Sequence, residues 1–109
     1  MPFSQSLADR LRQAFGPGRG LVEKKMFGGL CFMLEGHMLV GIWKASLIVR
    51  VGPDQAAEAL KQEHVREFDL TRRPMTGWVL VDPDGLDTDE QLNAWIEKAM
   101  RFVETLPRK

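Results

Sequence analysis

The chain has 109 residues, of which 44% are hydrophobic and 28% are charged, a balance typical of one globular domain and not of a disordered chain. Its 15 basic and 15 acidic side chains cancel, which excludes the uniformly positive surface of a general nucleic-acid coat protein. No apolar run approaches the roughly 20 residues of a membrane span, and the first residues lack the pattern of a secretory signal. The single cysteine, Cys31, excludes an internal disulfide, which is typical of a cytoplasmic protein. Together these features predict one domain over residues 1–109, in the cytoplasm and without a membrane partner.

The charges are distributed unevenly along the chain. Residues 1–53 carry seven basic and three acidic side chains, a charge of +4, and residues 54–109 carry eight basic and twelve acidic ones, a charge of −4. This layout permits a local basic face or pairing between two copies. Folding that interleaves the two halves is the favoured interpretation.

The first predicted element is a helix that begins at a cap on Ser4 or Ser6 and ends at Phe15. Leu7 and Leu11 recur at helical spacing along it. The run from 16 to 20 contains three glycines and a proline, so it predicts a connecting loop.

The period then changes to two, in short segments that predict an antiparallel meander of four strands over residues 21–27, 30–35, 37–43 and 46–51. The predicted turns are Gly28-Gly29, Glu35-Gly36 and Lys44-Ala45.

Both faces of this meander are apolar. On the second strand Leu30, Phe32 and Leu34 oppose Cys31 and Met33, and on the third strict alternation sets Met38, Val40 and Ile42 against Leu39, Gly41 and Trp43. A solvated antiparallel sheet has one polar face. We therefore expect helices on one face and a further element or a second subunit on the other.

The second half of the chain predicts two helices and one more strand. Pro53-Asp54 opens a helix, residues 63–74 have the composition of a long polar loop, and a fifth strand covers 75–82. The last helix begins at a Thr88 cap and continues to Leu106. The predicted fold is α+β, with a sheet of about five strands and three helices in the order helix, four strands, helix, strand, helix.

Residues that could carry catalysis are few. Cys31 lies in mid-strand, where a buried, inert thiol is favoured over a nucleophile, and His37 and His64 stand alone, without the spacing of metal ligands. We expect no metal, no cofactor and no enzymatic activity. The alternative is an enzyme or a small-ligand binder with a pocket near Cys31, His37 and Trp43.

Basic residues next to apolar ones suggest a binding surface instead. Two groups of this kind occur. The first is Lys24, Lys25, Met26 and Phe27, and the second is Arg72, Arg73, Met75 and Trp78. If the two strands were neighbours, their shared edge would suit an acidic protein or a nucleic acid. The favoured interpretation of the lysines is that they protect an edge strand from unwanted pairing.

Arg50 is predicted to lie on the same face as Ile48, where its charge needs a partner. A structural ion pair with Glu35 or Glu23 is favoured over an anion-binding role.

Several segments, in this order, resemble the TfoX N-terminal domain family: Lys25-Met26-Phe27-Gly28-Gly29, Gly36-His37-Met38, Leu47-Ile48-Val49-Arg50-Val51-Gly52, Arg73-Pro74-Met75-Thr76-Gly77-Trp78-Val79 and Leu92-Asn93-Ala94-Trp95-Ile96. The resemblance implies an α+β fold similar to secretion-chaperone-like domains. It supplies no catalytic residue, and its matched positions include residues that folding alone can require: Gly28, Gly29, Gly36, Arg50, Gly77 and Trp95.

TfoX-like regulators act positively on competence genes in bacteria, together with a transcription factor. The resemblance covers only their N-terminal domain and not the helical C-terminal domain of two-domain members. We therefore expect a non-catalytic interaction or regulatory module that binds a protein, such as a transcription factor, or a second copy of itself. Direct nucleic-acid binding through a basic edge is the alternative from another class.

Overall fold

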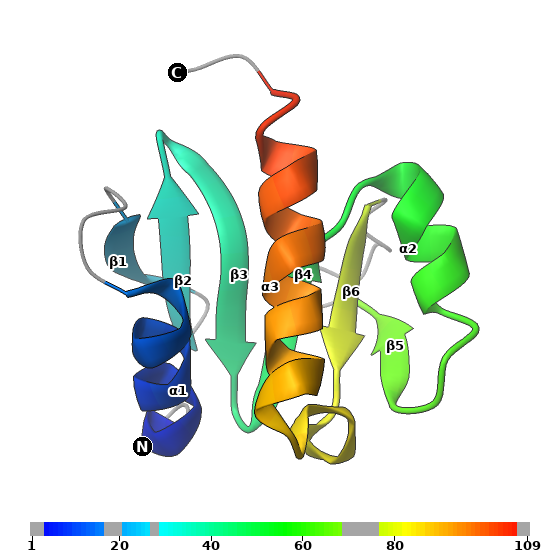
Figure 1. Ribbon diagram of the computed structural model, residues 1–109, viewed down its shortest axis with the longest axis horizontal. Coiled ribbons are helices and arrows are strands. Elements are labelled where there is room, and N and C mark those ends of the chain that lie inside the picture. The colour runs from blue at the N-terminus through cyan, green and yellow to red at the C-terminus, as the bar shows by residue number, and fades with distance from the viewer. Residues whose placement is uncertain (1–3, 17–20, 27–28, 69–76, 107–109) are drawn as a thin grey trace.

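The computed structural model describes residues 4–16, 21–26, 29–68 and 77–106, and in them three α-helices pack on one face of a six-stranded antiparallel sheet (Figure 1). The strand order is β1-β2-β3-β4-β6-β5. The elements are α1 (Gln5–Phe15), β1 (Leu21–Met26), β2 (Gly29–Leu34), β3 (His37–Trp43), β4 (Ser46–Arg50), α2 (Pro53–Ala59), β5 (Val65–Glu67), β6 (Trp78–Val81), the 3₁₀ helix η1 (Pro83–Leu86) and α3 (Asp89–Val103).

The predicted α+β class and the meander from β1 to β4 are confirmed. The strand count is one too low, because β5 lies inside the segment predicted as a polar loop. Three residues, Val-Arg-Glu, are too few to show an alternating pattern, and β5 depends on its pairing with β6. The predicted fifth strand is β6, which begins at Trp78, and residues 69–76 lie outside the described residues, as do Phe27 and Gly28.

The predicted faces of β3 are wrong at two positions. The register shifts between Phe32 and Met33, where Phe32 pairs with Val40 and Met33 pairs with Met38, so Leu39 is the extra residue of a β-bulge. Leu39 consequently joins Val40 and Ile42 beneath the helices, and Met38 lies on the opposite face. Strict alternation cannot anticipate this, because a bulge inverts the order of the side chains beyond it.

The main hydrophobic core lies between the sheet and the helices. Leu11 and Phe15 of α1 and Ala99 of α3 are buried against strands β2 to β4 and β6, and the ring of Phe15 stacks on that of Phe32 at 5.7 Å between centroids. Both long helices have the caps that the sequence predicts. Ser4 accepts a hydrogen bond from the backbone of Leu7 in α1, and Thr88 forms a capping box with Gln91 in α3.

The opposite face of the sheet carries a second, smaller core. Its buried members are Cys31, Met38, Ile48, Phe68 and Leu80, and the partly buried Trp43 and Trp78 pack against them. The expectation of an apolar face here is confirmed. Phe68 follows β5 directly and is 2% exposed, so the segment predicted as a polar loop supplies one of the largest buried side chains on this face.

Two glycines join β4, α2 and β6. The carbonyl of Gly77 accepts hydrogen bonds from the backbone nitrogens of Val51 and Gly52 at 2.9 and 3.0 Å. A Cβ at Gly77 would lie 3.3 Å from the backbone of Gly52, and both glycines have a positive φ, of 91° and 89°. The family position Gly77 therefore has a structural reason to be glycine.

None of the helices in the described ranges is long and apolar enough to cross a membrane.

Candidate functional site

The two groups of predicted binding residues are not neighbours in the sheet. Lys24 and Lys25 lie on β1, and Trp78 lies on β6, with β2, β3 and β4 between the two strands (Figure 1). Arg72, Arg73 and Met75 lie outside the described residues, as does the side chain of Met26. The shared basic edge required neighbouring strands, and the sheet order does not provide them.

β1 is an edge strand, as the lysine pattern predicts. It pairs with β2 along its whole length and is the first strand in the sheet order. Leu21 packs against the main core, whereas Val22 is 60% exposed and Lys24 and Lys25 are also exposed. Within the described part of the chain, neither lysine takes part in an ion pair. The edge therefore presents an exposed apolar side chain beside two uncompensated positive charges.

An ion pair holds this edge strand to α1. Arg12 donates to both carboxylate oxygens of Glu23, from Nε at 2.8 Å and from Nη2 at 2.7 Å, and its Nη1 donates to Asp9 at 3.0 Å. The hydrogen bonds from Arg12 lower the pKa of Glu23, and the same bonds raise the pKa of Arg12. The bidentate contact links α1 to β1 and leaves the Glu23 carboxylate paired, so among the described residues of β1 the unpaired charges are those of Lys24 and Lys25.

Replacing Glu23 by glutamine should make the stability of the domain less sensitive to acid. A carboxyl with a lowered pKa stabilises the fold above its ordinary pKa, here 4.5, and this contribution is lost as the pH falls through the folded value. Urea midpoints of wild type and Glu23→Gln should therefore differ most at about pH 7 and converge by about pH 3. Glu97→Gln is the control, because Glu97 pairs with Arg101 within a single helix. A Glu23→Gln difference that is independent of pH would contradict the ion pair.

Arg50 does not form the predicted ion pair. Glu23 is bound by Arg12, and no described carboxylate pairs with Arg50. Its guanidinium instead lies over the rings of Trp78 and Phe102, at 5.2 and 5.5 Å from their centroids. Partial burial lowers the pKa of Arg50. Aromatic faces replace the expected carboxylate because β4, β6 and the end of α3 meet at this point, which spacing in the sequence does not reveal.

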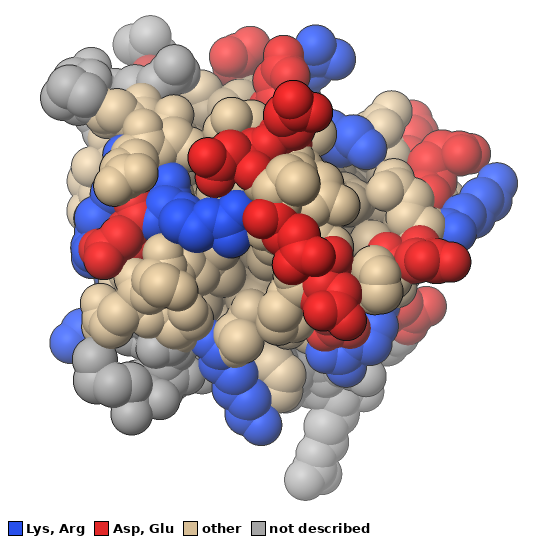
Figure 2. Space-filling model, turned by 60° about the horizontal axis from the view of Figure 1, so that its bottom comes forward, with Lys and Arg blue, Asp and Glu red and all other residues tan. Residues whose placement is uncertain are grey.

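One ion pair of the described residues joins the positive first half of the chain to the negative second half. Arg10 of the first half pairs with Asp89 of the second at 3.5 Å, and Figure 2 shows basic and acidic side chains intermingled over one face of the molecule. The interleaving of the two halves stays a prediction, because the other Arg and Lys ion pairs of the described residues join residues of the same half.

The candidate nucleophile and bases are dispersed. Cys31 is 1% exposed, and burial raises the pKa of its thiol, which keeps it protonated and unreactive. His37 is buried at the start of β3, whereas His64 is exposed and precedes β5. No three His, Cys, Asp or Glu residues in the described ranges are grouped so as to hold a metal ion.

Comparison with known families decides the membership of the chain. The model of the family described as TfoX N-terminal domain matches residues 13–103. The chain belongs to the TfoX N-terminal domain family. No curated protein and no solved structure matches it.

In this TfoX N-terminal domain the matched positions have structural places. Gly36 has a positive φ of 85° in the turn between β2 and β3, and Trp95 is 6% exposed in the main core. Gly29 begins β2, and Arg50 ends β4.

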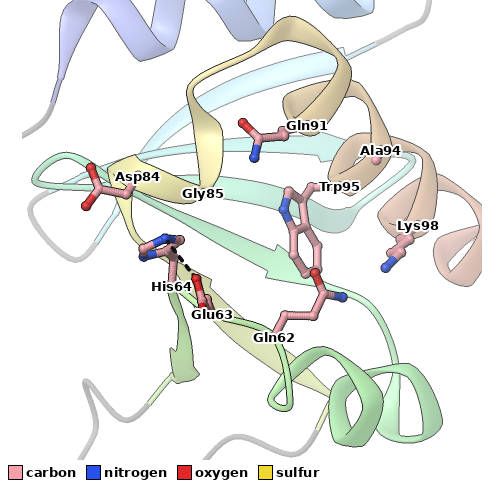
Figure 3. A pocket seen from close by; sticks show the side chains of 9 residues that line it. All are labelled: Gln62, Glu63, His64, Asp84, Gly85, Gln91, Ala94, Trp95 and Lys98. Carbon is pink, nitrogen blue, oxygen red and sulfur yellow. Dashed lines mark ion pairs between the residues drawn. The ribbon is translucent and has the colours of Figure 1, made fainter.

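Sequence reasoning missed a cavity of this TfoX N-terminal domain beside Trp95. Its lining includes Gln62, His64, Gln91 and Lys98, which come from the turn after α2 and from α3 (Figure 3). The helical spacing of Gln91, Trp95 and Lys98 was the available signal, since residues three and four apart share one helix face. The other wall, formed by the turn after α2, lies next to α3 only in the folded chain, and no pattern in the sequence predicts this contact.

Proposed function

We propose that the chain is a non-catalytic protein-interaction module of the TfoX N-terminal domain family, which binds an extended acidic segment of a partner along β1. The carrying observation is that β1 is an edge strand with two exposed lysines, neither of which pairs with a carboxylate in the described part of the chain. An edge strand offers unpaired backbone N–H and C=O groups, and a partner strand can add to them by the same hydrogen bonds that join strands within a sheet.

Charge favours an acidic partner over a second copy of the chain. Lys24 and Lys25 repel an approaching strand of the same charge and attract carboxylates. Strand β5, at the other edge, has three residues and is too short to offer a comparable template. A transcription factor with an acidic extended segment fits this proposal, and so would another regulatory protein of the cytoplasm.

The proposal is tested with a synthetic six-residue peptide of alternating valine and glutamate, which matches the length of β1. In two-dimensional ¹⁵N NMR spectra, the peptide should shift the backbone amides of residues 21–25, and added salt should reduce the effect. A peptide of alternating valine and lysine is the control and should leave these amides unchanged. Equal shifts with both peptides, or shifts that avoid β1, would overturn the proposal.

Charge reversal at the edge should weaken binding of the valine–glutamate peptide. The double variant Lys24→Glu/Lys25→Glu is expected to bind about tenfold more weakly, a change of about 1.4 kcal/mol. Lys44→Glu/Lys61→Glu changes the net charge equally at exposed sites outside β1 and should bind as the wild type does.

Two other results would indicate a different binding partner for the β1 edge. Concentration-dependent shifts of residues 21–25 without peptide would make a second copy of the chain the occupant. Binding of labelled single-stranded DNA at low salt, with shifts at β1, would favour the nucleic-acid alternative.

A further inference from the structure

The two lysines of β1 lie on opposite faces of the sheet. Lys25 pairs across the strands with Leu30 of the main core, on the face that the helices cover (Figure 1). Lys24 pairs with Cys31 of the second core, on the other face. Directly paired residues share a face, and successive residues of a strand alternate between faces. The edge therefore presents one positive charge on the helix face and one on the opposite face.

The other exposed positions of β1 set further limits on a partner strand. Val22 is 60% exposed and shares the face of Lys24, where it lies directly across from the partly exposed Met33. An apolar side chain on the partner can pack against Val22 and Met33. Glu23 lies on the helix face, and its carboxylate disfavours a second acidic group beside it. Positions 22 to 25 consequently favour apolar, uncharged, acidic and acidic neighbours, in that order.

An antiparallel partner strand is favoured over a parallel one. Every described pair of neighbouring strands in the sheet is antiparallel, and antiparallel pairing is slightly more stable per residue. An antiparallel partner passes position 25 of β1 first and position 22 last, so its own sequence has the order acidic, acidic, uncharged, apolar. Two acidic residues in succession place their carboxylates on opposite faces, one beside each lysine.

We propose that β1 selects an antiparallel partner strand with the order acidic, acidic, uncharged, apolar, whose adjacent carboxylates bind Lys25 and Lys24 and whose apolar side chain packs on Val22. This partner pattern rests on the proposed function, since it specifies which acidic segment the same edge binds. Acidic residues two apart in a strand lie on one face and reach only one of the two lysines. The order of the residues, and not charge alone, therefore decides the affinity.

Two six-residue peptides of identical composition separate the order of the residues from their charge. Thr-Glu-Glu-Thr-Val-Thr has the proposed order, whereas Thr-Glu-Val-Glu-Thr-Thr has its glutamates two residues apart, and both are acetylated and amidated at their ends. Binding is followed in ¹⁵N NMR titrations through the backbone amides of residues 21–25. The first peptide should bind about tenfold more tightly, because only it engages both lysines and the exposed valine of β1.

A third peptide tests the direction of the added strand. Thr-Val-Thr-Glu-Glu-Thr is the first sequence read backwards, so it presents the same side chains to β1 only when it lies parallel. It should bind more weakly than the first peptide.

Variants of β1 test each face separately. Lys24→Gln and Lys25→Gln should each reduce the tenfold difference between the first two peptides to about threefold or less, since each removes the charge from one face. Val22→Thr keeps the branched shape at an exposed site and should weaken binding of the first peptide about threefold. Lys44→Gln is the matched control, because Lys44 is exposed and lies outside β1, and it should leave the difference unchanged.

The outcomes distinguish this pattern from the proposed function. Equal binding of the first two peptides, with shifts at residues 21–25, would overturn the pattern and leave an acidic partner of β1 in place. The same holds for a tenfold difference that survives in Lys24→Gln or Lys25→Gln. Tighter binding of the reversed peptide would overturn the antiparallel direction. If no peptide shifts these amides, both the pattern and the proposed function fail.

Discussion

Gly52→Ala is expected to destabilise the domain by about 4 kcal/mol, of which about 2 comes from backbone strain and about 2 from crowding. Gly52 has a φ of 89° and a ψ of 158°, a region that is essentially restricted to glycine. A Cβ at this position would lie 2.5 Å from Cδ1 of Phe102. The ring cannot simply retreat, since it also lies beneath the guanidinium of Arg50.

Gly16→Ala is the matched control for this substitution. Gly16 has a φ of 69° and a ψ of 177°, in the same region of backbone space. Its chain neighbours aside, no atom of the described residues lies within 4 Å of the place that an alanine methyl group would take there. Urea unfolding should therefore show that Gly16→Ala lowers the free energy of unfolding by about 2 kcal/mol, the cost of backbone strain alone. The double variant Gly52→Ala/Phe102→Leu should lose less stability than the sum of the two single variants, because the smaller side chain at position 102 relieves the crowding. Equal costs for the two alanine variants would contradict the crowding at Phe102.

The local elements of this fold can be predicted from short stretches of the sequence. Helices α1 and α3 follow a 3.6-residue period and begin at Ser4 and Thr88, whose side chains cap the first turn through contacts three residues away. The hairpin between β2 and β3 follows from Glu35 and Gly36, both of which adopt positive φ. Such signals depend only on neighbours along the chain, so one sequence is enough to interpret them.

Features that depend on tertiary pairing could not be predicted in this way. The position of β6 between β4 and β5 separates Trp78 from the lysines of β1, and no local pattern encodes that order. The bulge at Leu39 and the three-residue strand β5 are also fixed by their partner strands. For the candidate sites, the lysines were visible because charge on an edge strand has a local signature. The cavity beside Trp95 was not, since its two walls come from segments that lie far apart along the chain.

The second core gives the last prediction, that Phe68→Ala costs about 4 kcal/mol, a large share of the roughly 5 to 15 kcal/mol typical of a domain. Phe68 is 2% exposed, packs in the cluster of Cys31, Ile48 and Leu80, and lies 6.1 Å from the Trp78 ring between centroids. Removing the ring leaves a cavity that the strands of a sheet cannot close by moving together.

Urea unfolding of Phe68→Ala and Leu60→Ala measures this difference. Leu60 is 36% exposed, so its truncation should cost less than about 1 kcal/mol. Phe68→Leu should fall between the two, because it retains much of the buried volume. If Phe68→Ala instead costs no more than Leu60→Ala, the apolar face opposite the helices does not act as a core. That face would then be the larger surface available to a partner, and β1 would lose its place as the leading interaction site. A cost near about 4 kcal/mol means that this face stabilises the domain itself, which leaves the edge of β1 for binding.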